Sequence, residues 1–192
     1  AGVCNGLTPC TTTIAAAVAA SSGGDVIQVF PGVYAESVNL SSMATPGNLT
    51  LTTVNPLGVP TPGTATVSPA SGSAFHTSAV LPGYLSLFGF VVRSVTADGI
   101  MVAVTGNVLI NQVTANDSYD DGIDITTTDG SLVVIDSTAN GNRGASDGDG
   151  FDLNTSGGSV VVTGSTANEN YDEGFDINAN GPVTVERCVA HR

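Results

Sequence analysis

One acidic phrase occurs three times in the second half of the chain, as Asp121-Gly122-Ile123-Asp124-Ile125, Asp149-Gly150-Phe151-Asp152-Leu153 and Glu173-Gly174-Phe175-Asp176-Ile177. The copies begin at residues 121, 149 and 173, so they lie 28 and 24 residues apart. A second phrase, Thr-Ala-Asn, accompanies each copy, at 114–116, 138–140 and 166–168. A period in the twenties without helical spacing is typical of a solenoid, in which each repeat stacks on the last. We therefore predict a stack of similar coils.

Short runs of β-branched residues lie between the two phrases, at 132–135, 160–162 and 183–185. Such runs, bounded by Gly, Asn and Asp, are typical of strands. One period has room for about three strands at ~3.3 Å per residue, and equivalent strands of successive coils are then parallel and ~4.8 Å apart. We predict an all-β protein, a parallel β-helix. We also expect the Asn column of the Thr-Ala-Asn phrase to hydrogen-bond along a turn.

The pattern weakens toward the N-terminus. Asp98-Gly99-Ile100-Met101-Val102 occupies the place of the acidic phrase 23 residues before its first full copy, with Met101 in place of the second acid. Segments 49–54, 65–67 and 85–92 are predicted strands between loops rich in Pro and Gly. We expect one domain, with an N-terminal cap over 1–24 and β-helix coils over 25–192 that are most regular from 95 to 192.

The segment Gly24-Asp25-Val26-Ile27-Gln28-Val29-Phe30-Pro31-Gly32-Val33-Tyr34 resembles the first coil of right-handed parallel β-helix proteins of the pectin-lyase-like superfamily. Members begin with a short capping helix, a Gly-Asp-x-Ile-x-Val strand and a Pro-Gly-x-Tyr turn. The resemblance implies a right-handed parallel β-helix solenoid with a short N-terminal capping helix, over residues 11–20. It implies no single function, because the superfamily contains lyases, hydrolases, adhesins and inert scaffolds.

The cysteines indicate the compartment. Cys4 and Cys10 lie just before the expected helix, and we predict that a disulfide between them fixes the cap. Cys188 stands alone, as a small buried thiol or as a partner for another molecule. A bridged terminus favours an extracellular or cell-surface location. No stretch approaches the ~20 apolar residues of a membrane span.

The coil that begins at residue 183 carries no capping residues in the sequence. An uncapped coil exposes unpaired backbone groups, which solenoids normally cover. We expect either that the natural chain continues beyond Arg192 or that molecules stack end to end, which would generate an open filament.

The charge is strongly negative. Seventeen acids against four Arg and no Lys give a formal net charge of -13, which argues against nucleic acid and anionic membranes as partners. Thirteen of the acids fall between Asp117 and Asp176, where Arg143 is the only base. Stacked coils place equivalent carboxylates above one another, where like charges repel by ~1 kcal/mol per pair even in water. Several such pairs would place a notable strain on the stack.

Calcium is the cofactor that such a column favours, because Ca²⁺ takes six to eight oxygen ligands. The spacing matches neither an EF-hand nor the nine-residue calcium repeat, so the alternative is that these turns simply face water and keep the protein soluble. No phosphate-binding glycine loop occurs, and we expect no organic cofactor. The predicted metal ligands are Asp120, Asp121, Asp124, Asp147, Asp149, Asp152, Asp172, Glu173 and Asp176.

Catalysis is not the favoured prediction. Paired carboxylates hydrolyse glycosides, and for an enzyme the candidates are Asp121, Asp124, Asp149 and Asp152. Pectate-lyase-like members of the superfamily add an Arg or Lys base, but none of the four Arg lies in a matching motif. Polygalacturonase-like members add Gly-His-Gly and Arg-Ile-Lys motifs, which are absent. His76 and His191 have no metal-ligand or triad partner in the sequence, and a catalytic site rarely repeats.

The sequence therefore favours a non-catalytic extracellular protein, structural or adhesive, that binds calcium on its Asp ladder and assembles end to end into a filament. A polysaccharide-active enzyme, lyase or glycoside hydrolase, on the Asp-rich face is the alternative. A carbohydrate-binding module is the second alternative, disfavoured by the few aromatic residues available for stacking on sugar rings. A polysaccharide or a cell surface is the expected partner.

Overall fold

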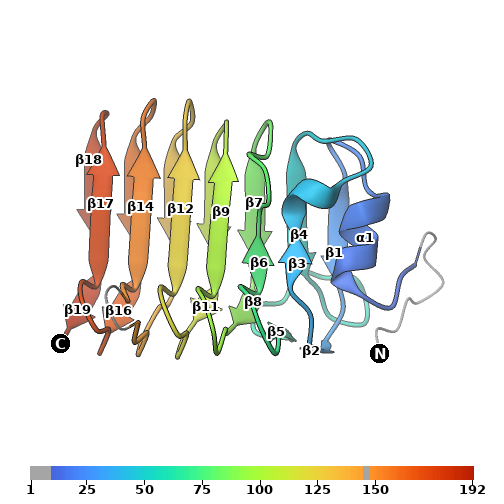
Figure 1. Cartoon of the computed structure of the whole chain (residues 1–192), viewed down its shortest axis with the longest axis horizontal. Coiled ribbons are helices and arrows are strands. Elements are labelled where there is room, and N and C mark those ends of the chain that lie inside the picture. The colour runs from blue at the N-terminus through green and yellow to red at the C-terminus, as the bar shows by residue number, and fades with distance from the viewer. Residues whose placement is uncertain (1–9, 145–147) are drawn as a thin grey trace.

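The computed structural model of the protein describes residues 10–144 and 148–192. Its strands follow one another around a long axis, and all pairs between named strands are parallel (Figure 1). The side chains alternate between the interior and the outer face, as a pleated strand requires. The fold is an all-parallel β-solenoid, as predicted, and it has about seven turns.

The first sheet runs the whole length of the stack, in the order β1-β4-β7-β10-β13-β15-β18. Its strands include the three runs of β-branched residues predicted between the acidic and Thr-Ala-Asn phrases. Their bounds are β1 (Val26–Val29), β4 (Leu49–Thr53), β7 (Leu85–Phe88), β10 (Val108–Asn111), β13 (Leu132–Ile135), β15 (Val160–Thr163) and β18 (Val183–Glu186).

The second sheet contains the acidic phrase. Its order is β3-β6-β9-β12-β14-β17, and the three copies of the phrase supply the last three strands in register. The bounds are β3 (Val38–Asn39), β6 (Phe75–His76), β9 (Ile100–Val104), β12 (Ile123–Thr127), β14 (Phe151–Thr155) and β17 (Phe175–Ala179).

The third sheet contains the Thr-Ala-Asn phrase. Its first part pairs in the order β2-β5-β8-β11 and its second part pairs β16 with β19. Single bridges from Thr138 to Thr114 and to Thr166 join the two parts. The bounds are β2 (Gly32–Tyr34), β5 (Ala65–Val67), β8 (Phe90–Val92), β11 (Thr114–Ala115), β16 (Thr166–Asn168) and β19 (Val189–His191).

The predicted capping helix is confirmed as α1 (Ile14–Ala20). Its N-cap is Thr13, whose hydroxyl accepts the Ala16 amide, and Glu36 accepts the amides of Ile14 and Ala15 at 2.8 and 3.0 Å. Ile14 is buried against the first coil, so α1 covers one end of the stack (Figure 1). A 3-10 turn, η1 (Leu40–Ser42), follows β3. No helix in the described parts of the chain is long and apolar enough to cross a membrane.

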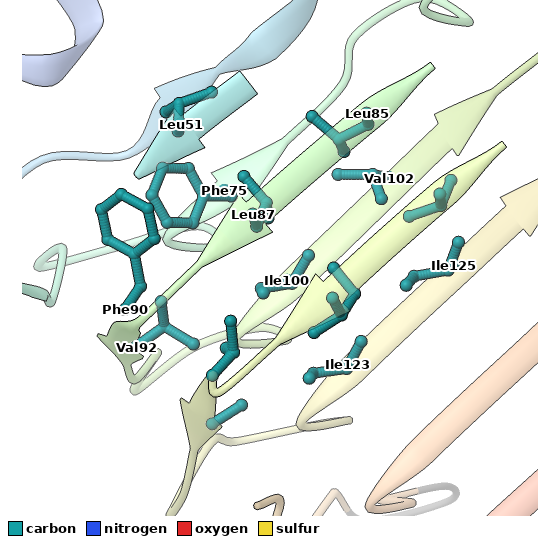
Figure 2. Packing of buried hydrophobic residues seen from close by; sticks show 14 of the residues in the cluster. Leu51, Phe75, Leu85, Leu87, Phe90, Val92, Ile100, Val102, Ile123 and Ile125 are labelled. Atoms are coloured by element: carbon teal, nitrogen blue, oxygen red, sulfur yellow. The ribbon is translucent and has the colours of Figure 1, made fainter. Parts of the chain in front are cut away.

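The interior is a continuous ladder of apolar side chains from all three sheets. In Figure 2, Leu51 and Leu87 follow each other from coil to coil in the first sheet, and Ile100 and Ile123 do so in the second. Phe75 and Phe90 pack edge to face with ring centroids 5.0 Å apart. Because only 5% of the residues are aromatic, aliphatic contacts fill most of this core.

A left-handed corner follows each strand of the first sheet from β7 onward. The corner residues have positive φ, and only some of them are glycine, the residue that adopts this conformation without strain. Nothing in the sequence marks the others as corner residues. The five are Gly89, Gln112, Asp136, Gly164 and Arg187.

The two ends of the stack differ. The first coil lies under α1, whereas β18 and β19 at the other end are exposed along their whole length. Val183, Val185 and Val189 are 49%, 47% and 43% exposed there. End-to-end association stays a prediction, and α1 would stand in the way of a simple head-to-tail contact.

Candidate functional site

The first group of predicted acids forms a hydrogen-bond ladder at the turn before the second sheet. Asp98 Oδ1 accepts the Asp121 amide at 3.1 Å, Asp121 Oδ1 accepts the Asp149 amide at 2.7 Å, and Asp149 Oδ1 accepts the Glu173 amide at 2.7 Å. The three aspartates are buried, with at most 7% of each exposed. We call Asp98, Asp121, Asp149 and Glu173 the acid ladder. It satisfies backbone donors that the turn would otherwise leave buried and unpaired.

A glycine column beside the acid ladder explains why the two phrases recur together. A Cβ added at Gly150 would lie 2.6 Å from the carbonyl oxygen of Gly174 and 2.8 Å from the Cβ of Ala167. Gly122 meets Ala139 in the same way, also at 2.8 Å. The Gly of each acidic phrase therefore packs on the Ala of a Thr-Ala-Asn phrase, and neither position has space for a larger residue.

The Asn column of the Thr-Ala-Asn phrase is a second ladder, as predicted. Asn116 Oδ1 accepts the Asn140 amide at 2.9 Å and Asn140 Oδ1 accepts the Asn168 amide at 2.6 Å. Asn168 in turn accepts the His191 amide at 3.0 Å, so His191 continues the column. These asparagines hold coil to coil.

The second group of acids forms a column on the outer face of the second sheet. Asp124 lies opposite Asp152, and Asp152 lies opposite Asp176. Asp124 and Asp152 are half-buried and Asp176 is exposed. The side-chain amide of Asn154 donates from Nδ2 to Asp152 Oδ1 at 2.6 Å. Met101 precedes Asp124 in this column and His76 precedes Met101.

The remaining predicted ligands lie in the preceding turn. The Asp120 amide donates to Ala97 O and the Asp172 amide donates to Gly148 O at 3.5 Å, in each case in the coil before. The two acids therefore occupy the same turn, two coils apart. Asp120 is half-buried and Asp172 is exposed. Asp147 lies outside the described residues. The predicted ligands thus occupy three columns.

Carboxylates of all three columns influence Asp124. Burial and the neighbouring carboxylates, in the order Asp152, Asp98, Asp121 and Asp120, raise the pKa of Asp124 to about 7. We call these five residues the carboxylate cluster. A carboxyl that is half-protonated near neutral pH marks a concentration of negative charge, and such groups gather at functional sites.

The cluster fits calcium in its chemistry, since all of its donors are carboxylate oxygens. It is not a ready-made metal cage: in residues 10–144 and 148–192 no three His, Cys, Asp or Glu side chains lie together as a ligand set. Cation binding would therefore need the carboxylates to draw inward. The predicted ligand set stays a prediction.

His76 is held by its neighbours rather than free in a site. Its Nδ1 lies 3.1 Å from the Ser37 hydroxyl, which donates to Ser73 O at 2.6 Å. Burial lowers the pKa of His76, so the ring is neutral at physiological pH. Because the Ser37 proton is engaged by Ser73 O, the pair does not form a nucleophile and its base.

The structure describes one of the two cysteines of the predicted disulfide. Cys10 is disulfide-bonded, and Cys188 is the one free cysteine in the part of the chain that the structure describes. Cys4, its predicted partner, lies outside the described residues, so the pairing stays a prediction. Cys188 is half-buried near Val162 O, at 3.6 Å.

Two further features lie in the turns, and the repeats carry a signal for the first, since Asn142 and Asn170 each stand two residues after a Thr-Ala-Asn phrase. Asn142 is fully buried; its Oδ1 accepts the Ser118 amide at 2.9 Å and its Nδ2 donates to Asn170 Oδ1 at 3.0 Å. Near it an open cavity of about 380 Å³ adjoins Tyr119. Its lining is Arg93, Val95, Asp117, Ser118, Tyr119, Gly141 and Arg143.

Comparison with known proteins agrees with this geometry. A family model described as the Pel9A-like, right handed beta helix region matches residues 5–192, nearly the whole chain. Neither the curated proteins nor the solved structures gave a match. The family match confirms the right-handed β-helix of the pectin-lyase-like superfamily predicted from the first coil. The chain belongs to the Pel9A-like right-handed β-helix family.

Proposed function

We propose that this protein is a non-catalytic β-helix that acts outside the cell as a structural or adhesive element and binds calcium at the carboxylate cluster. The observation that carries the proposal is the register that places Asp124 opposite Asp152, where burial and four neighbouring carboxylates raise the pKa of Asp124 to about 7. A divalent cation would neutralise that charge, and all of the donors are of the kind that calcium prefers.

The acid ladder supports a structural role for the repeated acids. Asp121 and Asp149 each use one carboxylate oxygen to accept a backbone amide of the next coil, at 2.7 Å in both cases. A residue used in this way in successive coils serves the stack rather than a single reaction. The disulfide-bonded Cys10 supports an oxidising compartment, where such bonds persist.

Thermal unfolding with EDTA and then with millimolar calcium tests the cation. Calcium should raise the melting temperature, because a ligand of the native state stabilises it by mass action. Asp124→Asn combined with Asp152→Asn should abolish the rise. Asp129→Asn, which removes a charge from an exposed turn of the same coil, is the matched control and should keep it. An unchanged melting temperature in the unmodified protein would sink the calcium site.

Self-association is tested in the same samples by light scattering. Particle size that grows with protein concentration, and more so with calcium, would support an assembling scaffold. A single monomeric size up to high concentration would remove the filament from the proposal and leave the calcium site untouched.

The second candidate is a polysaccharide-active enzyme, lyase or glycoside hydrolase. Asp124 favours it, since a carboxyl with a pKa near neutrality suits general acid catalysis, and Asp152 lies opposite it in register. Incubation with neutral and acidic polysaccharides, followed by reducing-end and absorbance assays, decides between the two. Cleavage that Asp124→Asn abolishes and Asp129→Asn keeps would replace the first proposal.

A further inference from the structure

Two exposed tyrosines share one column of the turn with an arginine between them. The amides of Tyr119, Arg143 and Tyr171 donate to the carbonyls of Ser94, Ser118 and Asn142 in the coil before, at 2.9, 3.2 and 2.8 Å. The three residues therefore occupy the same position in successive coils. Both tyrosines are 53% exposed, and Arg143 is exposed as well. We call them the tyrosine column.

The tyrosine column borders the open cavity of about 380 Å³, into which Tyr119 and Arg143 both reach. Arg93, one coil earlier, also lines it, with its Nε donating to Asp117 O at 3.2 Å. Two of the four basic residues of a chain with net charge -13 thus line one cavity. Asp117 and Ser118 add acceptors to these donors, so the lining is polar and of mixed charge.

We propose that the tyrosine column and the adjoining cavity form a binding site for an uncharged polysaccharide. An aromatic ring offers an apolar face for a sugar ring, and few polar groups placed beside it fix the orientation of a ligand. Tyr119 and Tyr171 lie two coils apart, about 10 Å at ~4.8 Å per coil, which suits two rings of one chain. The sugar chain would run along the axis of the stack.

Sugar hydroxyls need donors and acceptors together, and the lining supplies both. The guanidinium groups of Arg93 and Arg143 donate, and the carboxylate of Asp117 accepts. A polyanion would meet Asp117 in the cavity and Asp120 directly beside Tyr119, so an uncharged chain is the better match. This site shares no residue with the carboxylate cluster and does not depend on the proposed calcium.

Exposed tyrosines also correct the expectation that aromatic residues for sugar stacking are lacking. Three of the four tyrosines are more than 40% exposed, and two of these three lie in the one column. The number of aromatic residues in the sequence is low, but the winding of the chain brings the useful ones together.

Intrinsic fluorescence tests the site, because the chain has four Tyr and no Trp to mask their emission. Titration with hexaoses of β-1,4-linked glucose, xylose and mannose, repeated by calorimetry, should show binding of at least one of them. Tyr119→Ala should weaken it about tenfold, roughly the 1.4 kcal/mol of one good aromatic contact. Tyr119→Phe should retain it, and EDTA should leave it unchanged.

The matched control is Tyr84→Ala, which removes a tyrosine that is 41% exposed and lies outside the column. It should alter the dissociation constant less than twofold. Arg143→Ala should weaken binding and Arg143→Lys should restore it only partly, because an ammonium lacks the planar fork. Absence of binding to all three hexaoses, or equal losses for Tyr84→Ala and Tyr119→Ala, would overturn the site. So would binding of hexagalacturonate alone, lost with EDTA, since that places the sugar on the carboxylate cluster.

Discussion

The early and late coils of this β-helix are held by different devices. In the early coils, as far as β8, the interior is filled by large side chains such as the edge-to-face pair of Phe75 and Phe90. The late coils have a packed interior too, with the rings of Phe151 and Phe175 stacked 5.0 Å apart, but from β9 onward side-chain ladders of Asp and Asn also connect each coil to the next. The early coils also vary more in length, since β4 begins at Leu49 and β7 only at Leu85.

The difference shows what a visible sequence repeat reports. Apolar packing tolerates many combinations of residues of suitable volume, so the early coils share a fold without sharing a phrase. A ladder needs the same short polar side chain at the same place in every coil, because each link accepts one backbone amide. The repeat in the sequence is therefore clearest where ladders connect the coils, whereas coils held by packing alone wind in the same way without a shared phrase.

The largest expected effect is in the early coils. Phe75→Ala should reduce the free energy of unfolding by about 3–5 kcal/mol, because a fully buried ring is removed from its contact with Phe90. Urea denaturation measures it. Phe88→Ala, on the outer face of β7, is the control and should cost less than half as much. Equal losses would show that the early coils do not depend on their core in this way.

The next effect tests the close packing of the late coils. Gly150→Ala should cost roughly 2–3 kcal/mol, because the new methyl meets the backbone of Gly174 and the side chain of Ala167, which have little freedom to move. Gly32→Ala, whose Cβ would find ordinary contacts of 3.5 Å or more with Tyr34, should change stability little. Thermal unfolding of the two variants side by side is the measurement. A neutral Gly150→Ala would contradict the account of why the two phrases recur together.

A smaller loss is expected from a single buried side-chain bond between coils, at Asn142. Asn142→Ala should reduce stability by about 2 kcal/mol, because the buried Ser118 amide loses its acceptor. Asn111→Ala, at a half-buried outer position of β10, provides the comparison. Hydrogen exchange should show faster exchange at Ser118 in the first variant alone. Protection of the Ser118 amide that survives the substitution would mean that its bond to Asn142 is not what holds this turn.

The smallest effect is a change with pH at Asp124. Its pKa rises from 3.8 to about 7 on folding, so the folded state binds the proton more tightly than the unfolded chain. The stability that this proton provides is complete below pH 4 and is lost as the pH rises to 7. Asp124→Asn should therefore match the unmodified protein near pH 4 and exceed it by about 1 kcal/mol at pH 8, after allowance for screening of a half-buried group.

Chemical denaturation across that pH range measures the difference between the two proteins. A difference that does not change between pH 4 and 8 would contradict the raised pKa of Asp124. Addition of calcium at pH 8 should reduce the advantage of the variant, since a bound cation would stabilise the charged form.

The sequence predicts the winding of this fold well and its corners poorly. The period, the strands and the capping helix are all legible, because each depends on side chains whose type is constrained. The corners at Gln112, Asp136 and Arg187 are not, because the same left-handed turn is filled there by three unrelated residues. A conformation imposed by the neighbouring coils leaves no mark on residue type.

The sequence identifies the residue types of the site but not their arrangement in space. The repeated phrases identify the acids, but they do not separate Asp121, which bonds to the backbone, from Asp124, which lies on the outer face. Asp124 lies within β12, where the alternation of the strand places its side chain on the outer face. Asp121 lies in the turn before the strand, where that alternation does not apply. Tyr119 and Tyr171 do share a phrase, since each stands two residues before a copy of the acidic phrase, but the sequence alone does not show that both are exposed on one column with Arg143 between them.

The acid ladder and the Asn ladder also give the stack a direction. In both, the acceptor belongs to the earlier coil and the amide donor to the later one, as in Asp121 to Asp149 and Asn140 to Asn168. A chain made from its N-terminus thus presents each new coil with a row of acceptors already in position on the coil before it. Growth from the cap outward needs no later segment to complete these rows, and the molecule is a template for its own extension during synthesis.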